Sequence, residues 1–190
     1  MSALVQAALP TARTIRWWPL AVVVVALTGL VLVARSADRP AGAVLLLGAA
    51  ALASLVVTAL RDDATVVLEA LPVSTARRNA LRLTLMGAPV LVAWWSLLEV
   101  ADATRPGTAS LLVLATCGVA VATMGASRRS VLAGAAVPVL WFAADRVAGG
   151  RGTLGEVLGW WRTDPWPVLL VALPVALLFS LAARIGGGRR

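Results

Sequence analysis

Lysine, histidine and tyrosine are absent from the 190-residue sequence, and its single cysteine is Cys117. Each absence excludes a class of chemistry. A standard phosphate-binding P-loop requires a lysine, so this chain is not expected to hydrolyse ATP itself. Without histidine and with one cysteine, neither an ordinary zinc, haem or di-metal site nor a Ser–His catalytic pair can form. We therefore expect no enzyme activity, no metal and no cofactor in this chain, and no disulfide within it.

Charged residues are also scarce, since they make up 14% of the sequence while hydrophobic residues make up 60%. A soluble domain carries about 25% charged residues. Apolar runs of about 20 residues recur, and this is the length that crosses a bilayer core of about 30 Å. The composition therefore predicts an integral membrane protein with almost no soluble part. The net charge of +8 comes from arginines beside the apolar runs, which indicates contact with membrane lipid and not with nucleic acid.

The apolar runs predict an all-α integral membrane fold, with six transmembrane helices in a single domain that covers residues 1–190. Short polar turns separate most of the runs, whereas residues 145–165 form a longer outer loop. Residues 153–161 of this loop fit two interpretations equally, a short amphipathic helix at the outer leaflet or a glycine-rich loop anchored by tryptophans. The predicted spans are residues 17–34, 41–60, 83–101, 108–126, 131–144 and 166–183.

The distribution of arginine predicts the orientation of these spans. Six spans place both termini on one side of the membrane, together with the polar segments 61–82 and 127–130. This side carries 11 arginines and 3 acids, and the opposite side carries 6 arginines and 6 acids. Positively charged loops are retained in the cytoplasm, so the termini and the segment 61–82 are predicted to be cytoplasmic.

The longest polar interruption of the chain lies between the second and third predicted spans and reads RDDATVVLEALPVSTARRNALR, residues 61–82. Its first part has apolar residues at helical spacing, which predicts a short amphipathic helix along the membrane surface. Asp62 or Asp63 can cap the start of this helix, because an acid suits the positive end of the helix dipole. The residues on the apolar face are Ala64, Val67, Leu68 and Leu71.

The second part of this segment leads back into the membrane. Pro72 disfavours continuation of the first helix, and Ser74 can cap the next one. The three arginines Arg77, Arg78 and Arg82 follow. They fit either retention by the positive-inside rule alone or contact with lipid phosphates or acids of a partner. The acids Asp62, Asp63 and Glu69 fit a helix cap and a solvated face, but acids beside an anionic leaflet favour a protein partner.

This segment resembles the cytoplasmic loop between the second and third spans of bacterial ABC-2-type transporter permeases. Such permeases commonly carry an acidic residue, a short amphipathic helix that ends in Leu-Pro-Val-Ser or similar, and a basic segment. Here these features are Glu69, then Leu71-Pro72-Val73-Ser74, then Arg77-Arg78. In that family the helix is the coupling helix, which docks into a groove of a separate ATPase subunit. The six-span plan of the family also matches.

The resemblance implies a permease subunit of an ABC exporter in the bacterial cytoplasmic membrane. It also implies two partners, an ABC ATPase subunit that binds ATP and Mg²⁺, and a second permease copy or paralogue. The alternative is a non-transporting accessory or immunity-type membrane subunit that binds a partner through residues 61–82. The residues implied at the ATPase-coupling interface are Asp62, Asp63, Val67, Leu68, Glu69, Leu71, Pro72, Val73, Ser74, Arg77 and Arg78.

Three charged residues near the outer ends of the third and fifth spans are candidates for an outer path or gate, namely Glu99, Asp145 and Arg146. Charge inside a membrane indicates function by default. The alternative is that these side chains extend to the interface, where charge costs little. No charge falls at the predicted midplane of the membrane, which disfavours an ion-coupled carrier.

The fourth span has a face of small residues, Gly118, Ala122 and Ala126, at intervals of four. Such a face allows close approach of a second helix. The second helix can belong to the same chain or to a second copy.

Overall fold

The structure is a computed structural model that describes residues 15–61, 75–102, 107–124, 127–149 and 152–187. These residues form seven α-helices, and no strand occurs within the described ranges, which confirms the predicted all-α fold class for this part of the chain. The helices are α2 Trp18–Ser36, α3 Gly42–Thr58, α5 Thr75–Ala101, α6 Thr108–Thr123, α7 Arg128–Ala148, α8 Gly152–Thr163 and α9 Pro165–Gly187.

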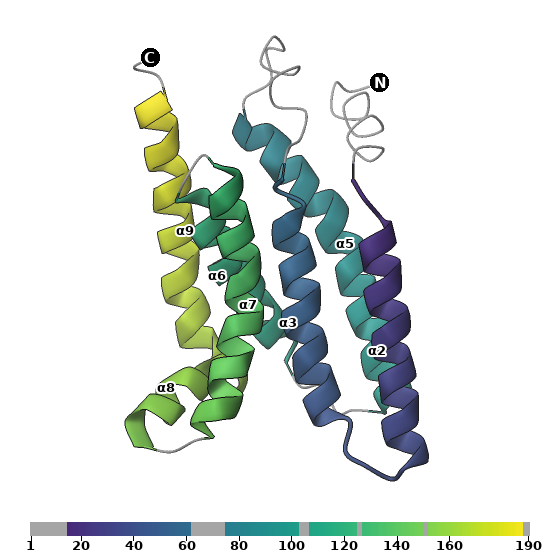
Figure 1. The fold of residues 1–190 in the computed structure, drawn as a ribbon. Helices are drawn as coiled ribbons and strands as arrows, with labels where there is room; N and C mark the ends of the chain where they lie inside the picture. Colours follow the sequence, from purple (N-terminus) through teal and green to yellow (C-terminus); the bar gives the residue numbers. More distant parts are fainter. Residues whose placement is uncertain (1–14, 62–74, 103–106, 125–126, 150–151, 188–190) are drawn as a thin grey trace.

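All helices except α8 run side by side in alternate directions, and α8 lies across one end of the bundle (Figure 1). Helices α2, α3 and α5 pack on one another, and α6 packs on α7 and α9. Helix α3 also contacts α6 and α7, so it joins the first group of helices to the second. The shared core between them contains fully buried apolar side chains, among them Leu52, Trp94, Leu97, Leu111 and Leu114.

Three helical segments are long and apolar enough to cross a membrane: α2, residues Arg77–Ala101 of α5, and α7. Three shorter apolar segments lie beside them, Gly42–Thr58, Thr108–Thr123 and Pro165–Leu178. Large apolar side chains also cover the outside of the bundle, with Trp18, Val25 and Leu170 between 72% and 77% exposed. Such a surface is stable against lipid and not against water. These features together indicate a membrane protein.

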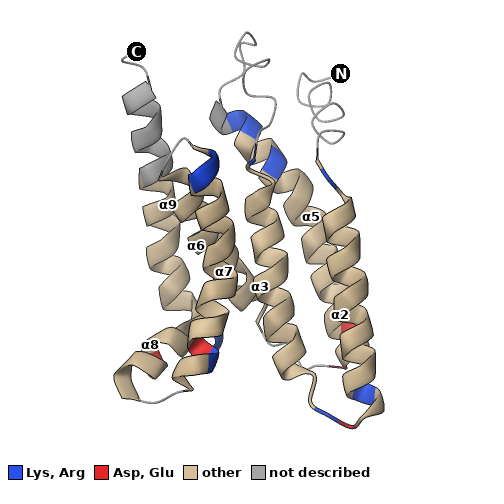
Figure 2. Ribbon diagram, in the orientation of Figure 1, with Lys and Arg blue, Asp and Glu red and all other residues tan. Residues whose placement is uncertain are grey.

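Charged residues gather at the two ends of the bundle, and its middle carries none among the described residues (Figure 2). The end at which α2, α5 and α7 begin carries arginines and no described acid. The described acids lie at the opposite end. They are Asp38 and Asp102 in the turns after α2 and α5, Glu99 in the last turn of α5, Asp145 near the end of α7, Glu156 in α8 and Asp164 just after it. The end without described acids therefore has the larger share of the described arginines, whereas the end with the acids also carries Arg35, Arg39, Arg146 and Arg162.

Helices α2, α5, α7 and α9 extend beyond the predicted spans, α5 and α7 by the most. Helix α5 begins at Thr75, eight residues before the predicted start of the third span. Helix α7 continues to Ala148, so the predicted outer loop 145–165 is shorter than expected. Gly149 ends α7 with φ at +57°, a left-handed conformation that glycine adopts without strain, and donates to the carbonyl of Asp145. Most of the remaining loop is α8, which decides between the two interpretations of residues 153–161 in favour of a helix.

The small-residue face of the fourth span lies against α7. A Cβ atom built on Gly118 of α6 would lie 2.8 Å from the carbonyl oxygen of Gly134 in α7. A Cβ atom built on Gly134 would lie 2.7 Å from both the nitrogen and the Cβ atom of Ala122. Carbon atoms do not approach backbone so closely, so both glycines are needed for the contact. The face is therefore used within the chain, with Ala126 outside the described residues.

Candidate functional site

Most of the predicted ATPase-coupling interface lies outside the described residues, so the surface helix before Pro72 stays a prediction. The described part is the first turn of α5, where Arg77 is exposed and Arg78 is partly buried. The coupling residues that lie outside the described ranges are Asp62, Asp63, Val67, Leu68, Glu69, Leu71, Pro72, Val73 and Ser74.

The sequence predicted that Arg82 faces the membrane surface, lipid phosphates or acids of a partner, but the structure buries its side chain within the bundle. Its side chain is buried, with 5% exposed, and its Nη1 atom donates to the carbonyl oxygen of Arg61 at 2.9 Å. Arg61 lies just after the end of α3, where carbonyl groups lack helical partners and a cation is favourable. The guanidinium of Arg82 therefore ties the end of α3 to the second turn of α5. In the sequence, residues 62–74 connect these two helices.

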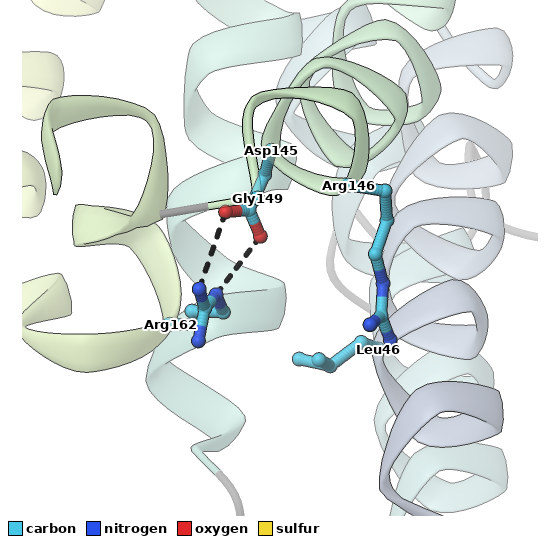
Figure 3. A pocket seen from close by; sticks show the side chains of 5 residues that line it. All are labelled: Leu46, Asp145, Arg146, Gly149 and Arg162. Atoms are coloured by element: carbon cyan, nitrogen blue, oxygen red, sulfur yellow. Dashed lines mark hydrogen bonds and ion pairs between the residues drawn. The ribbon is translucent and has the colours of Figure 1, made fainter. Parts of the chain in front are cut away.

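At the opposite end of the bundle, Asp145 of α7 forms a bidentate ion pair with Arg162 of α8 (Figure 3). The Nε atom of Arg162 lies 2.9 Å from Oδ2 of Asp145, and its Nη2 atom lies 3.3 Å from Oδ1. The Asp145 side chain is only 3% exposed. A buried carboxylate is stable only when it is paired. Asp145 therefore does not extend to the interface, which was the alternative drawn from its position in the sequence.

A second contact anchors α8 one helical turn away. Trp141 of α7 donates from Nε1 to the carbonyl oxygen of Leu158 at 2.9 Å. Trp141 and Asp145 are one turn apart on α7, and their partners are one turn apart on α8. Both pairs are therefore separated by 17 residues in the sequence. Nothing in the sequence identifies Arg162 as the partner of Asp145, because the contact depends on how α8 packs on α7.

A cavity of about 250 Å³ opens at the junction of α3, α7 and α8. Its walls are Leu46, Asp145, Arg146, Gly149 and Arg162, and Figure 3 shows their arrangement. The structure thus brings together two of the three predicted outer residues, Asp145 and Arg146. Glu99 does not line this cavity and lies exposed in the last turn of α5.

Arg146 is exposed, and its guanidinium carbon lies 5.5 Å from the centroid of the Phe142 ring. This distance is within the range of a cation–π interaction. Arg146 makes no hydrogen bond or ion pair with any described residue, unlike Arg162. The cavity therefore has one arginine engaged with an acid and one arginine engaged only with a ring.

Comparison with family models, with curated proteins and with solved structures finds no match to this chain. Within the described ranges no three potential metal ligands lie together. The functional argument therefore rests on the geometry and charge of the two ends of the bundle.

Proposed function

We propose that this chain is the permease subunit of an ABC exporter in the bacterial cytoplasmic membrane. All helices except α8 then cross the membrane, with both termini and residues 61–82 in the cytoplasm. The shorter α3 and α6 have 17 and 16 residues, which correspond to about 25 Å at a rise of about 1.5 Å per residue. They lie beside the longer helices, and the turns at their ends add the remaining length. The larger share of arginines at the end without described acids supports this orientation.

One observation carries the coupling role, namely the junction of Arg82 with Arg61. The segment proposed to dock into an ATPase connects the end of α3 to the start of α5, and this hydrogen bond links the end of α3 to the second turn of α5. A load on the segment therefore moves both helices together. Helix α3 contacts α2, α5, α6 and α7, so a shift of α3 reaches both halves of the bundle. This connectivity is what a coupling element requires, because the force must pass from one loop to most of the spans.

The ATPase partner would bind ATP and Mg²⁺, and a second permease copy or paralogue would complete the translocation path.

The apolar middle of the bundle favours an amphipathic or lipid-like substrate over an ion. An ion-coupled carrier needs a charged or ion-coordinating centre within the membrane. The described middle of the bundle has no charged side chain, which disfavours that class.

The proposed orientation predicts the labelling of single cysteines. In a Cys117→Ala background, we expect Arg39→Cys to react with a membrane-impermeant maleimide in intact spheroplasts, because Arg39 is exposed in the turn after α2. We expect Arg129→Cys, exposed at the start of α7, to react only after lysis. The Cys117→Ala chain itself should not be labelled. Labelling in the reverse order would overturn the orientation, and labelling of both sites before lysis would show that the two ends lie on one side.

The coupling role predicts capture of an ATPase. We expect the tagged chain to bring down a nucleotide-hydrolysing subunit from native membranes, with ATPase activity in the eluate. Glu69→Arg reverses one charge of the segment, and Leu71→Asp removes an apolar contact, so each should abolish capture. Glu156→Arg is the matched control, because Glu156 is an exposed acid on α8 at the opposite end, and it should leave capture unchanged.

Three other results of this pull-down are informative. A folded wild-type chain that captures no ATPase contradicts the permease role. Capture that survives both substitutions places the interface elsewhere than residues 61–82. Capture of a protein without ATPase activity, lost with the same substitutions, indicates the accessory-subunit alternative.

A further inference from the structure

The cavity at the junction of α3, α7 and α8 has an excess of positive charge. Two arginines and one acid line it, and the acid is already paired with Arg162. Its volume of about 250 Å³ is below the roughly 300 Å³ at which pockets for drug-sized ligands begin. The cavity therefore suits a small anionic group and not a whole exported molecule.

Both arginines that line the cavity keep N–H groups that no described residue engages. The pair with Asp145 uses Nε and Nη2 of Arg162, and its Nη1 atom has no partner among the described residues. The contact of Arg146 with the Phe142 ring leaves its N–H groups available, since a ring face accepts no conventional hydrogen bond. Figure 3 shows the Leu46 side chain between the side chains of Arg146 and Arg162, which come from α7 and α8.

We propose that this cavity binds the phosphate group of a ligand between Arg146 and Arg162. Arginine binds both carboxylate and phosphate with paired hydrogen bonds, and a phosphate group has enough oxygens for two guanidinium groups to share. A phospholipid headgroup and free inorganic phosphate both supply this chemistry. The neighbouring hollow of about 330 Å³, also lined by Arg162, carries the acid Glu156 in its wall and is less suited to an anion. The site does not depend on the permease role, because it lies at the end of the bundle opposite to residues 61–82.

The test uses the full chain, purified in detergent and stripped of bound lipid. Its thermal unfolding midpoint is followed during titration with dioctanoyl phosphatidylglycerol, with inorganic phosphate, and with dioctanoylglycerol, which lacks the phosphate. We expect at least one of the two phosphate-containing probes to raise the midpoint of thermal unfolding, and dioctanoylglycerol to leave it unchanged. Arg146→Gln should weaken the apparent affinity about tenfold, since a hydrogen bond to a charged group is lost. Arg39→Gln is the matched control, because it removes an exposed arginine of the same end that does not line the cavity.

The outcomes separate the two sources of phosphate. Stabilisation by the lipid alone identifies a phospholipid headgroup as the ligand, and stabilisation by inorganic phosphate shows that the free anion suffices. The proposal is overturned if neither phosphate probe binds, or if dioctanoylglycerol is as effective as the phospholipid. It is equally overturned if Arg146→Gln binds as tightly as the wild type, or if Arg39→Gln weakens binding to the same extent.

Discussion

Replacement of Gly134 by alanine should destabilise the folded chain by about 3 kcal/mol, because overpacking of a close helix contact forces the backbone to move. The added Cβ atom would lie 2.7 Å from the backbone nitrogen of Ala122 and would also collide with the carbonyl of Gly118. Neither is a side-chain atom that can rotate away, so α7 must separate from α6. Gly134→Leu should prevent folding, since no smaller adjustment accommodates its volume. The measurement is the thermal or denaturant unfolding of the purified chain in detergent.

Gly29 provides the matched control for this prediction. It also lies within a helix, α2, but a Cβ atom built on it meets nothing within 4 Å. Gly29→Ala should therefore leave stability unchanged or raise it slightly, by up to about 1 kcal/mol, because alanine loses less entropy in a helix. Equal effects of the two substitutions would mean that the α6–α7 contact does not depend on the small residues.

The helices of this chain could be predicted from the sequence because their signals are local. Run length identified the apolar helices, whereas α8 was left open between a helix and a loop, and charge placement identified the end that has arginines without described acids. The spacing of Gly118 and Ala122 identified a close-packing face on the fourth span. The partner of that face, Gly134, was not identified, because helix pairing depends on tertiary contacts that a single span does not encode.

The polar contacts of Arg82 and Arg162 could not be predicted from the sequence either, because they too depend on which helices pack together. Arg82 stands in a run of arginines, and the positive-inside rule explains such a run without assigning any of them a bond. Its contact with Arg61, 21 residues earlier in the sequence, joins the second turn of α5 to the end of α3. Asp145 and Arg162 also lie on different helices, and only the return of α8 onto α7 brings them together. The segment 62–74 stays a prediction, supported by its amphipathic pattern and by the resemblance.

Removal of the cation from the Asp145–Arg162 pair should destabilise the chain more than removal of the acid. Loss of one partner from a buried ion pair costs about 3 to 5 kcal/mol when the other charge stays buried. We expect about 2 kcal/mol for Arg162→Gln, because Asp145 is buried but Arg162 is 39% exposed, so water can partly reach the carboxylate. Asp145→Asn should cost less, about 1 kcal/mol, since the orphaned guanidinium can turn toward water.

The double variant Asp145→Asn/Arg162→Gln decides between electrostatic and packing origins of this effect. Two amides can form a neutral hydrogen bond, and no charge is then buried, so the double variant should recover most of the stability that Arg162→Gln loses. Arg146→Gln is the matched control, because Arg146 is the adjacent arginine and makes no ion pair with the described residues. Additive losses in the double variant would show that Arg162 acts through packing of its side chain alone. Hydrogen exchange in Gly152–Thr163 gives the local readout: exchange should quicken in Arg162→Gln and return toward the wild-type rate in the double variant, because the ion pair holds α8 against α7.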